Sequence, residues 1–168
     1  DVFEGEIFGL LGPNGAGKST TLEIIETLRT KTSGEVVVCG MNLDKEPDNI
    51  KKIIGVQLQT SGFYPGLTLV ELIHLFGGLY NQPVQPIELL KKVNLEDKAK
   101  NKFKDLSGGQ KQRFSIATTL INKPSIIFLD EPTTGLDPQA RRNLWELIKD
   151  IRSNGTTVII TTHYMDEA

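Results

Sequence analysis

The chain has 168 residues, enough for one domain with a hydrophobic core, and 24% of them are charged. Its 19 basic and 21 acidic residues give a net charge of −2 at pH 7, which excludes a general electrostatic attraction to nucleic acid. The single cysteine, Cys39, excludes an internal disulfide and fits a reducing compartment, and we interpret it as a small buried strand residue. Because the sequence begins without a methionine and stops where a helix is expected to start, we expect residues 1–168 to be one incomplete domain of a longer protein.

Apolar segments bounded by turn residues predict five β-strands, at residues 7–11, 35–39, 53–58, 126–129 and 157–161. Helical patterns separate four of these strands, which predicts an α/β fold with a mainly parallel sheet covered by helices. The segment at 34–39 follows a turn signal and is a candidate for a small separate sheet. No apolar segment approaches the length that crosses a bilayer.

Capping residues predict three helix starts. Thr68 and Ser107 each begin a capping box, in which a hydroxyl residue is followed three positions later by Glu or Gln. Asp137 caps a third helix whose first residue is Pro138, and Gly155 stands where that helix should end.

The segment between the strands at 53–58 and 126–129 is much longer than a simple crossover, for which a whole unit takes about 30 residues. We interpret residues 62–106 as an inserted helical subdomain. Its lysines suit either a nucleic-acid patch or a solvated face, and the interspersed acidic residues favour the solvated face, so no nucleic-acid partner is expected. The lysines are Lys91, Lys92, Lys98, Lys100, Lys102 and Lys104.

The segment GPNGAGKS at 12–19 fits the P-loop pattern, with a predicted strand before it and a predicted helix after it. Glycines let successive backbone N–H groups turn toward phosphate oxygens, Lys18 would bring its charge to the terminal phosphates, and the Ser19 hydroxyl would ligate Mg²⁺. A glycine-rich turn that binds nothing is the alternative, and the strand–helix context argues against it. The predicted nucleotide-binding residues here are Gly12, Pro13, Asn14, Gly15, Ala16, Gly17, Lys18, Ser19 and Thr20.

The segment SIIFLDEP at 125–132 is an apolar strand that ends in two carboxylates. Alternation along a strand predicts that Asp130 and Glu131 point to opposite faces and do different work. Beside a P-loop, Asp130 is expected in the Mg²⁺ shell, and Glu131 is expected to orient or deprotonate the attacking water. The alternative is a polar strand end that runs into a turn at Pro132.

The segment LSGGQ at 106–110 is a second helix start suited to an anion, which a single P-loop site does not need. With this motif, the chain resembles the ATP-binding cassette (ABC) ATPases, the nucleotide-binding subunits of ABC transporters. The resemblance covers essentially all 168 residues, and the motifs stand in the family's order. It implies a P-loop NTPase fold, truncated at both ends, that uses ATP and Mg²⁺.

The resemblance also implies roles for residues that the motifs above do not contain. Gln59 matches a glutamine that touches Mg²⁺ and senses the membrane partner, with Gln57 as the alternative in the same stretch. His163 matches the histidine that reaches the γ-phosphate, and with Gln59 and Glu131 it completes the implied catalytic set. Asp137 lies in the segment that matches the D-loop. The residues that match the signature motif are Ser107, Gly108, Gly109 and Gln110.

In the family, two cassettes dock head to tail, and the signature helix of one closes over the ATP held by the other's P-loop. The resemblance therefore implies a second cassette as partner, in a homodimer or heterodimer, and a transmembrane permease subunit at the cytoplasmic face of the cell membrane. The flanking sequences look like ABC-2-type exporters similar to daunorubicin-resistance cassettes. On this view residues 61–79 receive the permease, with Phe63 and Tyr64 as docking residues.

Two alternatives remain open from the sequence. One is an ABC-family ATPase without a permease that acts in DNA repair, on chromosomes or in translation, although no coiled-coil, zinc or tandem-cassette insertion is visible in the sequence. The other is a regulatory cassette that binds ATP without hydrolysing it, which the intact Gln59, Glu131 and His163 argue against.

Overall fold

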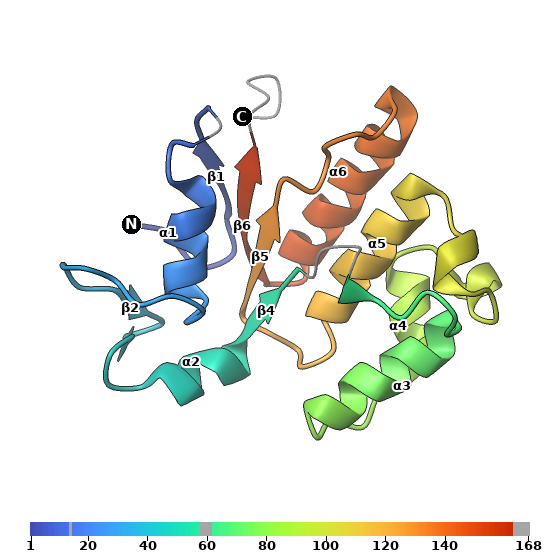
Figure 1. The fold of residues 1–168 in the computed structure, drawn as a ribbon, viewed down its shortest axis with the longest axis horizontal. Helices are drawn as coiled ribbons and strands as arrows, with labels where there is room; N and C mark the ends of the chain where they lie inside the picture. Colours follow the sequence, from blue (N-terminus) through green and yellow to red (C-terminus); the bar gives the residue numbers. More distant parts are fainter. Residues whose placement is uncertain (14, 58–61, 163–168) are drawn as a thin grey trace.

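The computed structural model describes residues 1–13, 15–57 and 62–162. Its centre is a four-stranded parallel sheet in the order β1-β6-β5-β4 (Figure 1). The strands are β1 (Ile7–Leu11), β4 (Ile54–Val56), β5 (Ile126–Asp130) and β6 (Thr157–Thr162). This arrangement confirms the predicted parallel sheet. Strand β4 is shorter than the predicted strand at 53–58, because Ile53 is the last residue of helix α2 (Pro47–Ile53).

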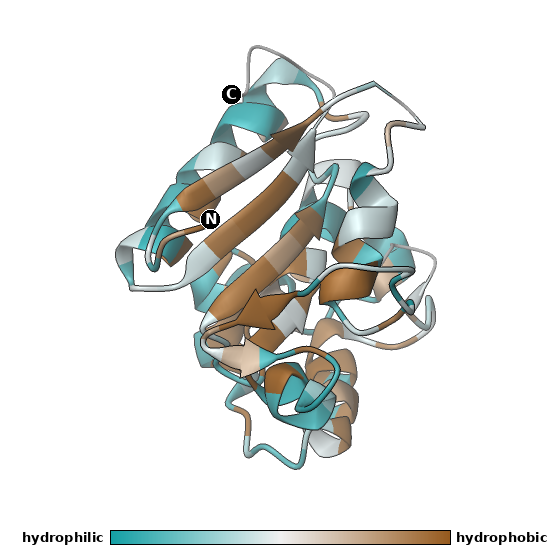
Figure 2. Ribbon diagram, turned by 90° about the vertical axis from the view of Figure 1, so that its left-hand side faces the viewer, coloured by the Kyte–Doolittle hydropathy of each residue, from teal (hydrophilic) through white to brown (hydrophobic). Residues whose placement is uncertain are grey.

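Helices cover both faces of the sheet, which explains why its strands are hydrophobic on both sides (Figure 1). Helix α1 (Lys18–Ile25) and α2 lie on one face, where Phe128 and Ile159 join their hydrophobic cluster. Helices α5 (Gly108–Thr119) and α6 (Pro138–Ser153) lie on the other face, over the cluster that contains Val158 and Ile160. The strands are accordingly coloured predominantly as hydrophobic in Figure 2.

A second, smaller sheet consists of strands β2 (Val37–Val38) and β3 (Met41–Asn42), which pair antiparallel. The turn between them is Cys39–Gly40, and both residues have positive φ angles, 49° and 78°, as a two-residue hairpin of type I′ requires. Cys39 is exposed at this turn. Our interpretation of Cys39 as a buried strand residue is therefore wrong, whereas the separate small sheet is confirmed.

The segment between β4 and α5 is helical in its described part. It contains α3 (Leu69–Leu79), α4 (Pro86–Lys92) and two short 3₁₀ helices, η2 (Glu96–Lys98) and η3 (Phe103–Asp105). Their buried side chains join those of α5 and α6 in one hydrophobic cluster. No helix among the described residues is long and apolar enough to span a membrane.

Phe63 belongs to this cluster and is only 4% exposed. Its ring centroid lies 4.7 Å from that of Phe103, 5.4 Å from that of Phe114 and 5.7 Å from that of Phe76. The expectation that Phe63 is a docking residue is therefore wrong, because its ring is used for internal packing. Tyr64, next in sequence, is 63% exposed.

The three predicted helix caps are confirmed. The Thr68 and Ser107 hydroxyls each accept a hydrogen bond from the backbone N–H three residues later. In return, the Glu71 and Gln110 side-chain oxygens accept from the backbone N–H of Thr68 and Ser107. The Asp137 side chain accepts bonds from two backbone N–H groups at the start of α6. Gly155 follows the end of α6 with a φ of 93°, the left-handed conformation that ends many helices.

Candidate functional site

The P-loop segment connects the end of β1 to the start of α1, as predicted. Gly15 and Gly17 have φ angles of 81° and 87°, which side chains with a Cβ rarely adopt. Gly12 is constrained by sterics and not by its φ angle, because a Cβ there would lie only 3.3 Å from the Cβ of Ala16. The loop therefore needs its glycines to turn tightly into α1, with the free N–H groups of the helix start beside it. Asn14 lies outside the described residues.

Lys18 is the first residue of α1 and is only 8% exposed. Its ammonium Nζ donates hydrogen bonds to the carbonyl oxygens of Gly12 (2.8 Å) and Pro13 (3.2 Å). It also lies 3.7 Å from the carboxylate Oε1 of Glu131. The positive charge is thus held over the P-loop, where an anion bound by the loop would meet it.

Ser19 and Asp130 meet at the opposite side of the helix start, although they are far apart in sequence. The Ser19 hydroxyl donates to the two carboxylate oxygens of Asp130, at 3.2 Å and 3.4 Å. Both groups offer the hard oxygen ligands that Mg²⁺ prefers, and Mg²⁺ sites commonly use one or two carboxylates completed by phosphate and water. No group of three or more His, Cys, Asp or Glu residues suited to a metal occurs among the described residues. The donor set therefore fits Mg²⁺ bound together with a phosphate ligand, and not a metal held by protein alone.

Glu131 leaves the strand in a left-handed backbone conformation, with a φ of 45°. Strand β5 ends at Asp130, so strand alternation does not apply to this pair as we expected; the turn separates the two side chains instead. The Glu131 carboxylate accepts a hydrogen bond from the Thr134 hydroxyl (3.3 Å) and approaches Lys18. The two acids therefore have different neighbours, which agrees with the different roles predicted for them.

Thr161 and Glu26 lie beside these residues, and the motifs did not reveal them. The Thr161 hydroxyl on β6 donates to Asp130 and accepts from the backbone N–H of Glu131. The pairing of β5 with β6 places Thr161 opposite Asp130, and two consecutive threonines at the end of β6 were the available signal in the sequence. Burial, together with the nearby Asp130 and Glu23 carboxylates, raises the pKa of Glu26 from 4.5 to about 7.

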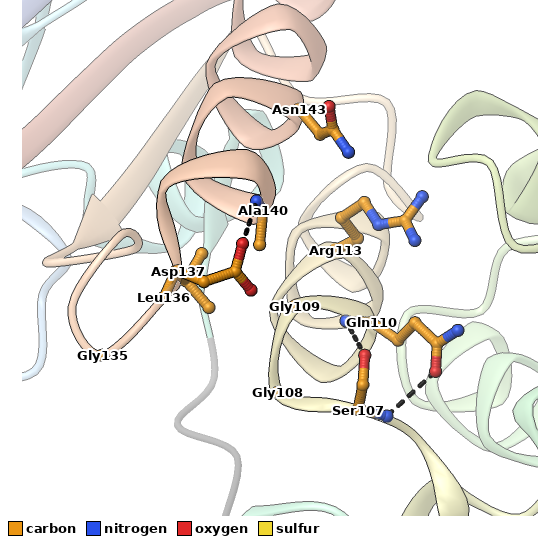
Figure 3. A pocket seen from close by; sticks show the side chains of 10 residues that line it. All are labelled: Ser107, Gly108, Gly109, Gln110, Arg113, Gly135, Leu136, Asp137, Ala140 and Asn143. Atoms are coloured by element: carbon orange, nitrogen blue, oxygen red, sulfur yellow. Dashed lines mark hydrogen bonds between the residues drawn. The ribbon is translucent and has the colours of Figure 1, made fainter.

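A pocket of about 280 Å³ lies between the starts of α5 and α6 (Figure 3). The Ser107 hydroxyl accepts from the Gln110 N–H (3.3 Å), and the Gln110 side-chain oxygen accepts from the Ser107 N–H (2.9 Å). A Cβ at Gly109 would lie 3.2 Å from that of Ala140, so this glycine lets the two helices approach. The structure thus brings the predicted signature residues together with Asp137 in one pocket. The predicted site residues that line it are Ser107, Gly108, Gly109, Gln110 and Asp137.

This pocket and the P-loop lie on different sides of the sheet (Figure 1). The P-loop leads into α1 on one face, whereas the pocket is formed by the helices that cover the other face.

The remaining predicted site residues are Thr20, Gln59 and His163. Thr20, in the first turn of α1, is exposed. Gln59 and His163 lie outside the described residues, so their roles stay predictions. The alternative glutamine, Gln57, is anchored by its backbone N–H to the Phe128 carbonyl, and its side-chain oxygen is buried without a partner among the described residues.

Comparisons of the sequence and of the structure with known proteins both find ATP-binding proteins of ABC transporters. A family model described as ABC transporter matches residues 1–134. The chain is 40% identical to the Nod factor export ATP-binding protein I of Cupriavidus pinatubonensis, over 99% of this chain and 53% of that protein. It is 42% identical to the linearmycin resistance ATP-binding protein LnrL of Bacillus subtilis, over 98% of this chain and 54% of that protein. The chain thus spans about half the length of these curated relatives.

Among solved structures, the dimeric ATP-binding cassette MJ0796, in a post-hydrolysis state bound to ADP and Pi, matches with a TM-score of 0.83 and 34% identity. The match covers 99% of this chain and 78% of that one. The ABC transporter component cbiO1 from Clostridium perfringens matches with a TM-score of 0.86 and 27% identity, over 99% of this chain and 70% of that one. The predicted α/β P-loop NTPase fold is confirmed as that of ABC ATPase cassettes. The chain belongs to the ABC transporter family.

Proposed function

We propose that the chain is the ATP-binding and ATP-hydrolysing cassette of an ABC exporter. One observation carries this proposal above the others. Lys18 and Ser19 at the start of α1 contact Glu131 and Asp130 at the end of β5, so that a cation, a hydroxyl and two carboxylates converge beside a P-loop. Each of these groups has a use in phosphoryl transfer to water.

The P-loop N–H groups and Lys18 bind the phosphates of ATP, with Thr20 at the same helix start. Ser19 and Asp130 would hold Mg²⁺, with Gln59 as a third ligand; the bound ion would supply charge neutralisation at the phosphates. Glu131 orients or deprotonates the attacking water. His163, which follows the last residue of β6 in sequence, is the residue proposed to reach the γ-phosphate. Before ATP binds, Lys18 is shared between loop carbonyls and Glu131, and phosphate oxygens replace these partners.

A second cassette completes the site. The signature residues line an open pocket away from their own P-loop, so the ATP that they meet belongs to a partner chain, in a homodimer or heterodimer. The dimeric state of the cassette MJ0796 supports this arrangement. Supplying groups from a partner makes hydrolysis depend on dimerisation, by the logic of an arginine finger.

A transmembrane permease is the other partner, which places the cassette at the cytoplasmic face of the membrane. Residues 62–106 form the helical subdomain that receives it, and Tyr64, Leu75 and Leu79 are exposed apolar or aromatic side chains on this segment. Phe63 does not contact the permease on this proposal; it stabilises the helical subdomain through its place in the buried cluster. The relatives named for Nod factor export and linearmycin resistance support an exporter of the ABC-2 type.

Light scattering of the full-length protein tests the arrangement. With Glu131→Gln, which slows turnover, Mg-ATP should convert monomers to dimers, and adding Lys18→Ala or Ser107→Ala should prevent the change. The head-to-tail proposal would be contradicted if the protein binds Mg-ATP but stays monomeric, both alone and when mixed with the second cassette of a heterodimer.

A further inference from the structure

Thr161 connects the two acidic residues at the end of β5 through a single hydroxyl group. Its Oγ1 donates a hydrogen bond to the Asp130 carboxylate and accepts one from the Glu131 backbone N–H at 2.9 Å. The parallel register of β5 and β6 places Thr161 opposite Asp130. Its side chain is fully buried, with 0% of the residue exposed, so water does not compete with the two acidic residues for this hydroxyl.

The direction of both hydrogen bonds follows from the chemistry of the groups. An ionised carboxylate only accepts and a backbone N–H only donates, whereas a hydroxyl has one proton to give and lone pairs to receive. A hydroxyl at this position can therefore serve both acids at once. An apolar side chain of the same shape would remove this partner from a part-buried N–H and from a carboxylate oxygen.

The bond to Asp130 orients its carboxylate. Thr161 binds Oδ1, and Ser19 makes its shorter contact, 3.2 Å, with Oδ2. Two hydroxyls on opposite sides thus fix the plane of the carboxylate. Groups that orient a metal ligand in this way usually matter nearly as much as the ligand itself.

The bond to Glu131 stabilises an unfavourable backbone conformation. A φ of 45° costs free energy in any residue with a Cβ, and surrounding contacts must hold it. The Glu131 N–H is bonded both to the Thr161 hydroxyl and to the Thr161 carbonyl (3.2 Å). This turn is what sends the Glu131 side chain toward Lys18 and the P-loop.

We propose that Thr161 is a positioning residue that sets the geometry of the metal ligand Asp130 and of the general base Glu131 together. This inference rests on the proposed function of the site and adds a residue to it. Because one hydroxyl serves both acids, its loss should affect metal binding and the chemical step, and should leave metal-free nucleotide binding at the P-loop unchanged.

The test compares Thr161→Val, which keeps the shape and removes the hydroxyl, with Thr161→Ser, which keeps the hydroxyl. Thr157→Val is the matched control, because Thr157 is a buried threonine of the same strand whose hydroxyl also accepts from a backbone N–H, that of Gly5 at 2.9 Å. The measurements on the full-length protein are kcat and KM for ATP, equilibrium ATP binding with Mg²⁺ and with EDTA, and the thermal midpoint.

For Thr161→Val we expect kcat to fall about 10- to 100-fold, the usual effect of losing an orienting partner. The gain in ATP affinity that Mg²⁺ brings should fall about 10-fold, with unchanged affinity in EDTA. Thr161→Ser should stay within about 3-fold of the original protein, and Thr157→Val should keep kcat even where its thermal midpoint drops. If Thr161→Val does not fold, Thr161→Ser and Thr161→Ala form a second pair that differs only in the hydroxyl.

Equal kcat and equal Mg²⁺ dependence in a folded Thr161→Val would overturn the inference, as would a Thr161→Ser protein as impaired as the valine variant. Failure of the proposed function looks different. In that case the unsubstituted protein would neither bind Mg-ATP nor hydrolyse it, and no Thr161 variant could be compared.

Discussion

The P-loop end of the molecule and the signature end are both helix starts suited to an anion, but they are built differently. At the P-loop, the polar side chains belong to elements far apart in sequence and contact one another: Lys18 lies against Glu131, and Ser19 binds Asp130. At the signature helix, the side chains of Ser107 and Gln110 each bond to the other residue's backbone N–H within one helical turn, beside an open pocket. At the P-loop one chain brings these side chains together by itself, whereas the signature residues face outward.

This difference predicts which substitutions should impair a single cassette and which should impair the pairing of two cassettes. A change at the P-loop end removes partners from residues elsewhere in the same chain, so binding or chemistry fails in the single cassette. A change at the signature end breaks only a local cap, and its main effect should appear when two cassettes meet. The substitutions below separate these cases, from the largest expected effect to the smallest.

Replacing Glu131, the proposed general base, should have the largest effect. Glu131→Gln keeps the size and the hydrogen-bonding reach of the side chain but cannot take a proton, so kcat should fall about 100- to 10,000-fold. ATP binding should persist, because the amide no longer pairs with the Lys18 ammonium that the phosphates need. Turnover and equilibrium ATP binding measure the two parts. Undiminished turnover would show that another group activates the water.

Removing the P-loop charge should weaken nucleotide binding itself. A hydrogen bond to a charged group contributes about 1.5–3 kcal/mol, so Lys18→Ala should lower ATP affinity roughly 10- to 150-fold in single cassettes. Isothermal titration with ATP in the presence of Mg²⁺ measures the change. Lys91→Ala is the control, since Lys91 is exposed and pairs with Glu88 on the surface. A Lys18→Ala protein with normal affinity would exclude the P-loop as the phosphate site.

The signature cap sharpens the comparison, because the chain contains a second capping box of the same kind. Ser107→Ala and Thr68→Ala should each cost about 1 kcal/mol of unfolding free energy, the usual value of an N-cap. Only Ser107→Ala should also weaken ATP-dependent dimerisation, by about 10-fold or more if one charge-assisted bond is lost. Chemical denaturation and light scattering measure the two effects. Equal dimerisation of both variants would mean that Ser107 serves its own helix alone.

The smallest effect on function is expected at Glu26, the buried acid near Asp130, where the change concerns stability and its pH dependence. The pKa of Glu26 is about 7 in the folded protein, above its usual 4.5, because of burial and nearby carboxylates. The native state therefore holds the proton more tightly, and the free energy of unfolding should fall as pH rises from about 4.5 to about 7. Glu26→Gln should remove this loss. The gain in unfolding free energy of Glu26→Gln over the original chain should be about 1–2 kcal/mol larger at pH 8 than at pH 5. This is less than the full pKa shift implies, because solvent screens part of the repulsion.

Urea denaturation at the two pH values measures this difference. Glu4→Gln is the matched control, because Glu4 is exposed and its replacement should change stability equally little at both pH values. A Glu26→Gln protein with the same pH dependence as the original chain would show that Glu26 is ionised in the native state at neutral pH.

Local signals in the sequence predicted most of the fold and the central part of the site. The strands follow from apolar segments between turns, the caps from side chains within one helical turn, and the P-loop from its glycine spacing. Phe63 and Tyr64 show the limit: both are aromatic neighbours, and only the distant rings of Phe103 and Phe114 decide which one is buried. The prediction for Cys39 was wrong because Val38 already pairs with Met41, so Cys39 is one of the two turn residues of the hairpin and not part of the strand.

Thr161 and Glu26 could not be found from local patterns for a related reason. Their environments depend on the register of β6 against β5 and on the approach of α1 to the end of β5, which are contacts between segments far apart in the chain. A buried threonine in a strand is common, and nothing near it in the sequence names the acids that it binds. Long-range register, more than residue type, carries this part of the site.

The parallel pairing of β1 with β6 has a consequence for the order of events during synthesis. Ile7 pairs with Val158, so β1 waits for its partner while about 150 residues are added, roughly 8 to 30 s at 5–20 residues per second. Throughout that interval β1 lacks its β6 partner, and an edge that β6 will later cover can meet other nascent chains. The P-loop is thus translated before the signature motif and the acidic end of β5, yet its strand acquires the β6 partner only after both of them.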